Sequence, residues 1–283
     1  MVKKVVVGHK YSMVKKHRAF LKWAGGKYGL SDTIRKLLPE GDCLIEPFVG
    51  AGSIFLNTNY DSYLLNDINR DLINLYNLLK LQPEQFIKDA QAFFNQEKNV
   101  ADSYYQLRAE FNASKDIYFR SLVFLYLNRH GYNGLCRYNK SGGYNVPFGK
   151  YKRPYFPEAE LTFFAEKAQK ATFVCEEYRA TFARAVSGDV IYCDPPYVPL
   201  SKTASFTSYA GNGFGLDEQA DLANAAEEVT ENKDIHVLIS NHDTIWTRKI
   251  YEHAKKLKSI NVARTISQKG NGRKKVAELL ALY

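Results

Sequence analysis

The stretch from Asp189 to Tyr197 constrains this chain most, because a short apolar run leads there into a carboxylate, two prolines and a tyrosine. Each proline forces the residue before it into an extended conformation, so Asp194 and Pro195 cannot turn helical. The prolines have no N–H, and this backbone therefore presents carbonyl oxygens. Two interpretations stay open on this stretch alone: a buried strand closed by a turn, or a stiff platform that holds a flat group carrying an NH2.

The composition is that of an ordinary globular protein, with 45% hydrophobic and 24% charged residues among 283. This length suits one large α/β domain or a core with one insertion. No apolar run approaches the roughly 18 residues of a membrane span, and Val5–Val7 is too short for a signal-peptide core. The four cysteines have no metal-binding spacing, so we expect free thiols in a reducing compartment and no structural metal.

The net charge of +9 is unevenly distributed. Eight Lys or Arg and no acid lie between Met1 and Ser31, and six more, again with no acid, lie between Ser121 and Pro157. The rest of the chain is therefore mildly acidic, at −5. In the second basic stretch the charges are interleaved with nine aromatic residues. Two basic patches on an acidic body predict a polyanionic partner.

A second informative stretch begins with the apolar segment Cys43–Pro47, which leads through Gly50 and Gly52 towards a helical segment. Strand, glycine turn and helix are the layout of a nucleoside site in a doubly wound sheet, although a lone Gly-x-Gly is a weak signal. The next expected strand, Ser62–Asp67, strengthens the prediction of a nucleoside site because it ends in an acidic residue. A carboxylate there accepts hydrogen bonds from both hydroxyls of a ribose.

The periodicity of the apolar residues predicts an α/β chain in which the alternation of strands and helices is interrupted once. The expected helices outside the interruption are Ser31–Leu38, Arg70–Lys80, Glu158–Lys170, Arg179–Ala185, Asp217–Thr230 and Thr244–His253. The further expected strands are Thr172–Cys175, Val190–Cys193, His236–Ser240 and Val276–Tyr283. The interruption is an inserted helical subdomain with the helices Glu84–Asn95, Ser103–Asn112 and Tyr118–Asn128.

The insertion ends in a hairpin-like region, residues 129–151, marked by Asn-Gly and Gly-Gly turn signals. Its Tyr, Asn and Arg side chains are suited to stacking on bases, bonding base edges and holding phosphates. Packing of these aromatic side chains on the body of the protein is the alternative. A glycine- and serine-rich segment, Ser201–Gly215, follows the proline stretch and is placed to act as a lid.

Taken together, the motifs resemble the Dam family of DNA adenine-N6 methyltransferases, which modify adenine in GATC. The resemblance covers nearly all of the chain from Arg18 onward. Its order also fits the family: cofactor motif, target-recognition insertion, catalytic motif. The segments that carry it are Leu21–Lys27, Glu46–Ser53, Tyr132–Asn139, Asn145–Gly149 and Asp194–Tyr197.

The resemblance implies a Rossmann-like, S-adenosylmethionine-dependent methyltransferase core, with a mostly parallel sheet and helices on both faces. Residues 18–80 and 157–283 would form this core, and residues 81–156 an inserted helical and hairpin domain that recognises the DNA target. Residues 1–17 form a basic leader that has no counterpart in the family pattern, and we expect it to be flexible.

The activity implied is transfer of a methyl group from S-adenosylmethionine to N6 of an adenine flipped out of double-stranded GATC. Asp194 and the Pro195 carbonyl would accept the two N–H bonds of the amine, and Tyr197 would stack on the base. The catalytic residues implied are Asp194, Pro195, Pro196 and Tyr197. The alternatives are the same core acting on RNA adenine, cytosine N4 or protein glutamine, and a DNA-binding module without turnover.

The resemblance also carries over binding residues. Those for the cofactor are Trp23, Lys27, Phe48, Gly50, Gly52, Asp67 and Asp194. Those for DNA are Lys22, Tyr132, Asn133, Leu135, Arg137, Asn145, Pro147, Lys150 and Tyr151, with Arg137 as the base reader and Lys150 on phosphate. We expect a monomer in the cytoplasm of a bacterium, or encoded by a phage, that reaches the nucleoid through DNA, with neither metal nor membrane.

Overall fold

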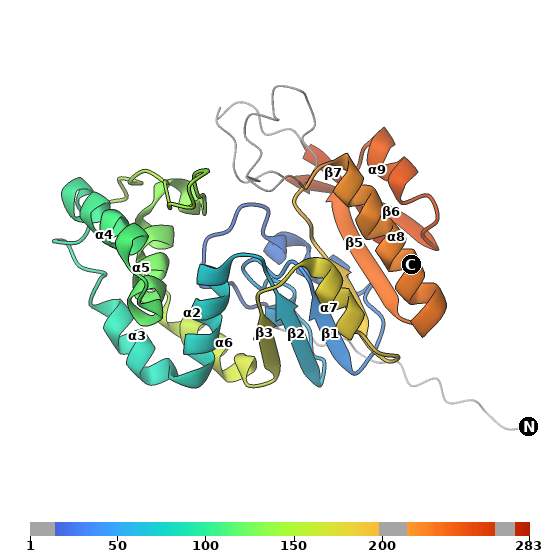
Figure 1. Ribbon diagram of the computed structural model, residues 1–283, viewed down its shortest axis with the longest axis horizontal. Helices are drawn as coiled ribbons and strands as arrows, with labels where there is room; N and C mark the ends of the chain where they lie inside the picture. Colours follow the sequence, from blue (N-terminus) through green and yellow to red (C-terminus); the bar gives the residue numbers. More distant parts are fainter. Residues whose placement is uncertain (1–14, 198–213, 264–274) are drawn as a thin grey trace, which may run out of the picture.

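Figure 1 shows the computed structural model, which describes residues 15–197, 214–263 and 275–283. Its centre is a seven-stranded sheet in the order β3-β2-β1-β4-β5-β7-β6. The strands are β1 (Cys43–Glu46), β2 (Ser62–Asn66), β3 (Ala171–Val174), β4 (Val190–Cys193), β5 (His236–His242), β6 (Lys256–Ala263) and β7 (Lys275–Leu282). The first five are parallel to one another, and β7 runs antiparallel to β5 and β6. The α/β sheet predicted from the sequence is confirmed.

Helices cover both faces of this sheet because its central strands are apolar on both sides. Leu44 and Tyr192 belong to a core shared with α2, α5 and α6. Ile45 and Ile191 belong to a second core with α7 and α8. The helices are α1 (Ser31–Arg35), α2 (Arg70–Leu81), α3 (Pro83–Gln91), α4 (Ala101–Ala113), α5 (Ile117–His130), α6 (Glu158–Ala168), α7 (Tyr178–Arg184), α8 (Leu216–Lys233) and α9 (Ile245–Ile250).

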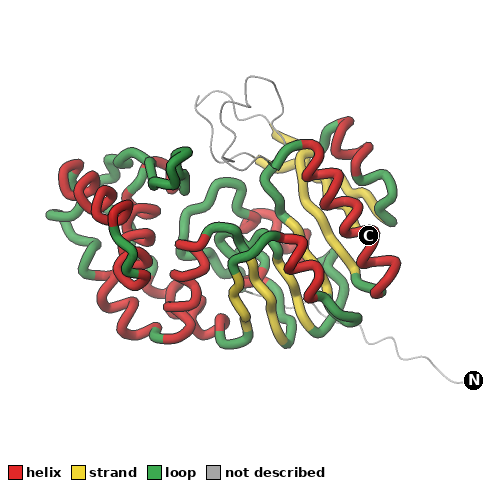
Figure 2. The backbone as a smooth tube through the Cα atoms, viewed as in Figure 1, coloured by secondary structure: helices red, strands yellow, loops and turns green. Residues whose placement is uncertain are grey.

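The helices α3, α4 and α5 lie between β2 and β3 in the chain and gather beyond the β3 edge of the sheet (Figure 2). Pro83 begins α3, where its missing N–H costs nothing. The Asp116 side chain caps α5 by accepting hydrogen bonds from the N–H groups of Tyr118 and Phe119. Every side chain of α5 from Ser121 to His130 is buried, so α5 joins the insertion to α2 and the core.

Five elements differ from the sequence-based expectation, and two of them are helices that end early: α1 ends at Arg35 rather than Leu38, and α3 ends at Gln91 rather than Asn95. Strand β6 was missed, because its lysines, Lys256 and Lys258, weaken the apolar pattern on a strand that pairs only with β7. The segment after the glycine turn, Phe55–Asn57, is a single 3-10 turn rather than an α-helix. Helix α9 ends at Ile250, before the expected end at His253.

The leader predicted to be flexible is only partly described. Within it, the His17 ring stacks on Phe163 with 3.5 Å between ring centroids, and the backbone N–H of His17 donates to Asn57 at 2.9 Å. The end of the leader is therefore packed on the core, which corrects the expectation for this residue. Residues 201–213 of the expected lid lie outside the described residues.

No helix in the described part of the chain is long and apolar enough to cross a membrane. All four cysteines are free. Among the described residues, no group of three or more His, Cys, Asp or Glu side chains is arranged to hold a metal ion.

Candidate active site

The segment Asp194–Tyr197 follows β4 directly, at the carboxyl edge of the parallel strands. Strand β4 lies between β1 and β5, so the residues that follow these three strands meet at one edge. Ligands of open α/β sheets bind in the crevice outside this edge. The proline stretch is thus both the end of a buried strand and part of the sheet edge where a ligand site is expected.

Asp194 is held by two donors that share one of its carboxylate oxygens. The Lys27 ammonium lies 2.9 Å from Oδ1, and the Ser240 hydroxyl donates to the same oxygen at 3.0 Å. Lys27 is only 5% exposed, and its ammonium also donates to the Gly25 carbonyl at 2.7 Å. Within the described residues no hydrogen bond engages Oδ2. Asp194 is therefore fixed in place through Oδ1, and the described residues leave Oδ2 to accept from a ligand.

Tyr197 closes this edge with its aromatic ring. The ring meets His242 edge-on, with centroids 4.6 Å apart, and the Lys27 ammonium lies 4.6 Å from its centre. Burial raises the pKa of Tyr197, and the negative charges of Asp194 and Glu278 raise it further. The phenol is therefore neutral at physiological pH.

Asp67 lies at the glycine turn, at the end of β2. Its two carboxylate oxygens accept hydrogen bonds from the backbone N–H groups of Gly50, at 3.1 Å, and Asn69, at 2.9 Å. Burial raises the pKa of Asp67, and these two hydrogen bonds act against that rise. Each oxygen keeps a lone pair that can accept from a ligand hydroxyl.

The turn itself needs glycine at Gly50. Its φ is +48°, and a Cβ there would lie 2.8 Å from the Trp23 indole nitrogen. The Tyr76 hydroxyl donates to the Gly50 carbonyl at 2.6 Å and fixes the other side of the turn. Trp23, Gly50 and Asp67 are thus brought together.

The two remaining residues predicted at the cofactor, Phe48 and Gly52, lie on either side of this turn. Phe48 packs against Tyr178 and Phe214, with ring centroids 5.5 Å away in both cases. Gly52 has φ +70°, a conformation that disfavours any other residue.

The residues predicted to bind DNA fall into small contacting groups along the hairpin-like region. The Arg137 guanidinium donates from Nε to the Asn145 side chain at 2.7 Å and from Nη2 to the Asn145 carbonyl at 3.2 Å. The Tyr132 N–H donates to the Pro147 carbonyl at 2.8 Å. Lys150 is exposed, with φ +54°.

A second group surrounds Lys22, which reaches the hairpin from the segment before the cofactor turn. Its ammonium lies 3.9 Å from the centre of the Tyr151 ring. The Tyr151 hydroxyl accepts from the Asn133 N–H at 2.9 Å. Burial and the nearby charge of Arg129 lower the pKa of Lys22 to about 8. Gly134 packs so closely that a Cβ there would collide with the Lys22 side chain.

The aromatic residues of this region divide between the two interpretations given above. Tyr144 is 1% exposed, and its hydroxyl donates to the carbonyl of the half-buried Leu135. Tyr138 packs on the core, and its hydroxyl donates to Asp71 at 2.7 Å. Tyr132 is 47% exposed. Packing therefore accounts for Tyr138 and Tyr144, whereas Tyr132 is open to a partner.

Several residues of the site were missed by sequence reasoning. Ser240 is on β5, and its place at the edge follows only from the pairing of β5 with β4. Glu46 belongs to a motif used above but had no role assigned. It is 2% exposed, burial raises its pKa to about 8, and its Oε1 has no hydrogen-bond partner in the described part of the chain.

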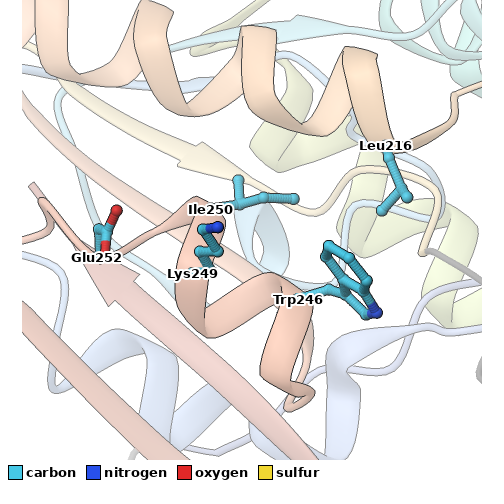
Figure 3. Close-up of a pocket in the computed structure, with 5 residues that line it drawn as sticks. All are labelled: Leu216, Trp246, Lys249, Ile250 and Glu252. Carbon is cyan, nitrogen blue, oxygen red and sulfur yellow. The ribbon is translucent and has the colours of Figure 1, made fainter.

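A shallow hollow of about 300 Å³ lies apart from these residues, between the start of α8 and α9. Leu216 and Trp246 point toward one another across it (Figure 3). None of the predicted site residues lines it. Its lining is Leu216, Trp246, Lys249, Ile250 and Glu252.

Comparisons with known proteins identify the family of this chain. The family of D12 class N6 adenine-specific DNA methyltransferases matches residues 23–266. A DNA adenine methylase of Vibrio cholerae is 62% identical over 270 residues, covering 95% of this chain and 97% of the relative. The corresponding methylase of Serratia marcescens is 61% identical (95% and 100% covered), and that of Escherichia coli K12 is 59% identical (95% and 96% covered).

Among solved structures, a precorrin 8w decarboxylase from Methanobacterium thermoautotrophicum covers 90% of this chain and 88% of its own. With a TM-score of 0.38 and 10% identity, this structure is too dissimilar to indicate a fold or a function. The family match and the methylases at about 60% identity favour DNA adenine as the substrate over RNA adenine, cytosine N4 and protein glutamine. The chain belongs to the D12 class of N6 adenine-specific DNA methyltransferases and is a Dam-family DNA adenine methyltransferase.

Proposed function

We propose that this methyltransferase uses S-adenosylmethionine to methylate N6 of the adenine in double-stranded GATC, with Asp194–Tyr197 as its catalytic platform. The observation that carries the platform assignment is the anchoring of Asp194 by Lys27 and Ser240, which among the described residues both contact Oδ1. The second carboxylate oxygen then accepts an N–H of the adenine amine, and the Pro195 carbonyl accepts the other.

Adenine N6 is a weak nucleophile because its lone pair is delocalised into the ring. Two acceptors on its N–H bonds favour a pyramidal nitrogen with a freed lone pair. S-adenosylmethionine supplies a methyl group on a positively charged sulfur, so the transfer requires alignment rather than a covalent enzyme intermediate. The contribution of Asp194 and Pro195 is to orient the amine.

The glycine turn fits a nucleoside on chemical grounds. Asp67 already accepts from two backbone N–H groups and keeps lone pairs for ribose hydroxyls. The Trp23 indole packs on the turn at Gly50 and offers a flat apolar surface beside it. With Lys27, Phe48 and Gly52, these residues would hold the methyl donor.

The target adenine must leave the duplex before the platform reaches its amine. Tyr132 and Asn133, which are exposed in the turn directly after α5, would fill the space that it leaves. Arg137 is held by Asn145 through Nε and Nη2, so Nη1 and the second Nη2 hydrogen remain for O6 and N7 of a guanine. Lys150 and Lys22 would bind the strand backbone or bases nearby.

The proposal extends to the organisation of the chain. Residues 18–80 and 157–283 form the catalytic core, and residues 81–156 form the DNA-recognition domain. The enzyme acts as a monomer on DNA in the cytoplasm of a bacterium or of a phage-infected cell. The leader up to residue 17 has no part in the reaction.

The test is to methylate a random-sequence plasmid and map the modified adenines, with Asp194→Ala beside the natural protein. We expect modification confined to GATC, abolished in Asp194→Ala while DNA binding survives. Asp221→Ala, which removes an exposed carboxylate paired with Arg179, serves as the control and should retain activity. Turnover by Asp194→Ala would overturn the platform assignment, and modification outside GATC would overturn the target.

A further inference from the structure

The backbone of the platform is anchored from a helix that the mechanism above does not use. Gln219, on α8, donates from its side-chain nitrogen to the Pro196 carbonyl at 2.7 Å. Pro195 and Pro196 have no N–H, so the backbone of these two residues can accept hydrogen bonds through its carbonyl oxygens but cannot donate any. Gln219 is completely buried, and a buried amide without a partner would be costly.

The orientation of the Gln219 amide is determined by two further buried side chains. Its oxygen accepts from the Asn241 side-chain nitrogen at 2.8 Å and from the Tyr251 hydroxyl at 2.9 Å. The Asn241 nitrogen also donates to the Tyr251 hydroxyl at 2.9 Å. Because two donors face the Gln219 oxygen, its NH2 group must face Pro196.

Asn241 and Tyr251 are held in turn, so each polar side-chain atom of the network has at least one partner. The Asn241 oxygen accepts from the His242 N–H at 2.8 Å, and both side chains are 0% exposed. Their positions come from three elements, since Gln219 is on α8, Asn241 is on β5 and Tyr251 follows α9. Helices α8 and α9 are the two that flank the hollow in Figure 3, where Leu216 precedes Gln219 by one turn.

We propose that Gln219 is a positioning residue for methyl transfer, which fixes the Pro196 carbonyl and thereby the direction in which the Pro195 carbonyl meets the adenine amine. The proposal rests on the platform function assigned above. Rotation of the Pro195–Pro196 peptide would move the Pro195 carbonyl away from the amine while Asp194 kept its contacts with Lys27 and Ser240. Gln219 therefore acts on the rate of transfer rather than on binding.

Two substitutions separate this role from a purely structural one. Gln219→Met keeps the length of the side chain but has no donor. Gln219→Glu keeps both length and acceptor, and donates to Pro196 only while its carboxyl is protonated. Burial raises the pKa of such a carboxyl toward neutrality. Thr230→Val is the matched control, because it removes one side-chain bond, to the Ile235 carbonyl at 2.8 Å, from the same helix.

The measurement is the single-turnover rate of methyl transfer with saturating S-adenosylmethionine and a GATC duplex, together with the Kd of each. A misplacement of about 1 Å can cost about a hundredfold in rate. We expect Gln219→Met to be slowed between about tenfold and a hundredfold, with both Kd values within about twofold of the natural protein. Gln219→Glu should be nearest to natural rates at low pH and slow as its carboxyl ionises, whereas Thr230→Val should be unchanged.

A natural rate in Gln219→Met, or a loss of binding equal to the loss of rate, would overturn the proposal. If Gln219→Met does not fold, the pH profile of Gln219→Glu decides, and a profile like that of the natural protein would overturn it. Asp194→Ala, measured in parallel, distinguishes failure of the proposed platform function from failure of the proposed role of Gln219. Methyl transfer by Asp194→Ala would refute the platform function. If Asp194→Ala is inactive and Gln219→Met is unaffected, only the role of Gln219 is refuted.

Discussion

The sheet edge that we propose to be catalytic, called the catalytic edge below, and the hairpin-like region of the insertion hold their polar side chains in opposite ways. At the edge, Lys27, Ser240 and Gln219 are buried, and each makes at least two polar contacts. On the hairpin, Arg137 and Lys150 are exposed, and in the described part of the chain the Arg137 side chain is held by hydrogen bonds to Asn145 alone. Methyl transfer needs groups that do not move, whereas reading a base needs groups that can exchange one partner for another.

Both regions are nevertheless joined to the same short segment of the core. The side chain of Asn69 caps α2 and donates to the Cys136 sulfur at 3.3 Å, and its N–H donates to Asp67. Asp71 binds Arg120 and the Tyr138 hydroxyl. The residues on either side of Arg137 are thus docked on the first turn of α2, immediately after the carboxylate proposed to bind ribose.

The largest effect should follow from breaking the catalytic edge at Lys27. Lys27→Met removes the cation that pairs with Asp194. The Lys27 side chain is 5% exposed, so water cannot readily take its place. Removal of one partner of a buried pair costs about 3–5 kcal/mol, equivalent to a factor between about 150 and 5,000. We expect a loss of single-turnover rate or cofactor affinity of this size. Lys16→Met, which breaks the exposed pair with Asp32, is the control and should change neither.

A smaller effect is expected on the hairpin, and it should concern sequence discrimination. Arg137→Ala should relax specificity at one base pair by about 1–3 kcal/mol, because a guanidinium that bonds a guanine edge distinguishes that base. Lys150→Ala should weaken all duplexes alike and flatten the dependence of Kd on salt. Competition binding with GATC and singly altered duplexes measures both. Equal loss of specificity in the two variants would show that base recognition and phosphate binding are not divided between Arg137 and Lys150.

Much of this arrangement was predictable where the deciding constraint is local. The prolines of Asp194–Tyr197 mark the end of β4, and β4 begins and ends where the sequence predicts. The glycine turn and the position of Asp67 beside it were likewise predictable, because each directly follows a strand that the sequence indicates. The mostly parallel sheet follows from the alternation of strands and helices.

Contacts between distant segments were not predictable in this way. Lys27 reaches Asp194 from a 3-10 helix near the start of the chain, and Gln219 reaches Pro196 from α8, so both contacts depend on the folded arrangement of distant segments. A single glutamine in a polar helix carries no sequence signal of such a contact. Strand β6 was missed for another reason, since an edge strand is stabilised by its partner and has little apolar pattern of its own.

The smallest expected effect is a pH dependence of DNA binding that arises at Lys22, between the two regions. Burial and the charge of Arg129 lower the pKa of Lys22 to about 8, and a DNA acceptor beside the amine would raise it in the complex. Below pH 8 the amine is charged in both states, so its contribution to affinity is complete. Above pH 8 the free protein loses a proton that the complex retains, and the affinity falls, by at most about tenfold per pH unit for one proton.

The Kd for a GATC duplex, measured from pH 7 to pH 9 at constant salt, tests this expectation. Lys22→Arg should bind with a flat profile, because a guanidinium stays charged throughout this range. Lys150→Arg is the matched control, and it should keep the slope of the natural protein since Lys150 is exposed. A slope that survives in Lys22→Arg would assign the titration to another group. A flat profile in the natural protein would mean that the Lys22 amine does not gain an acceptor from DNA. The segment around Lys22 would then contribute to the catalytic edge and not to DNA binding.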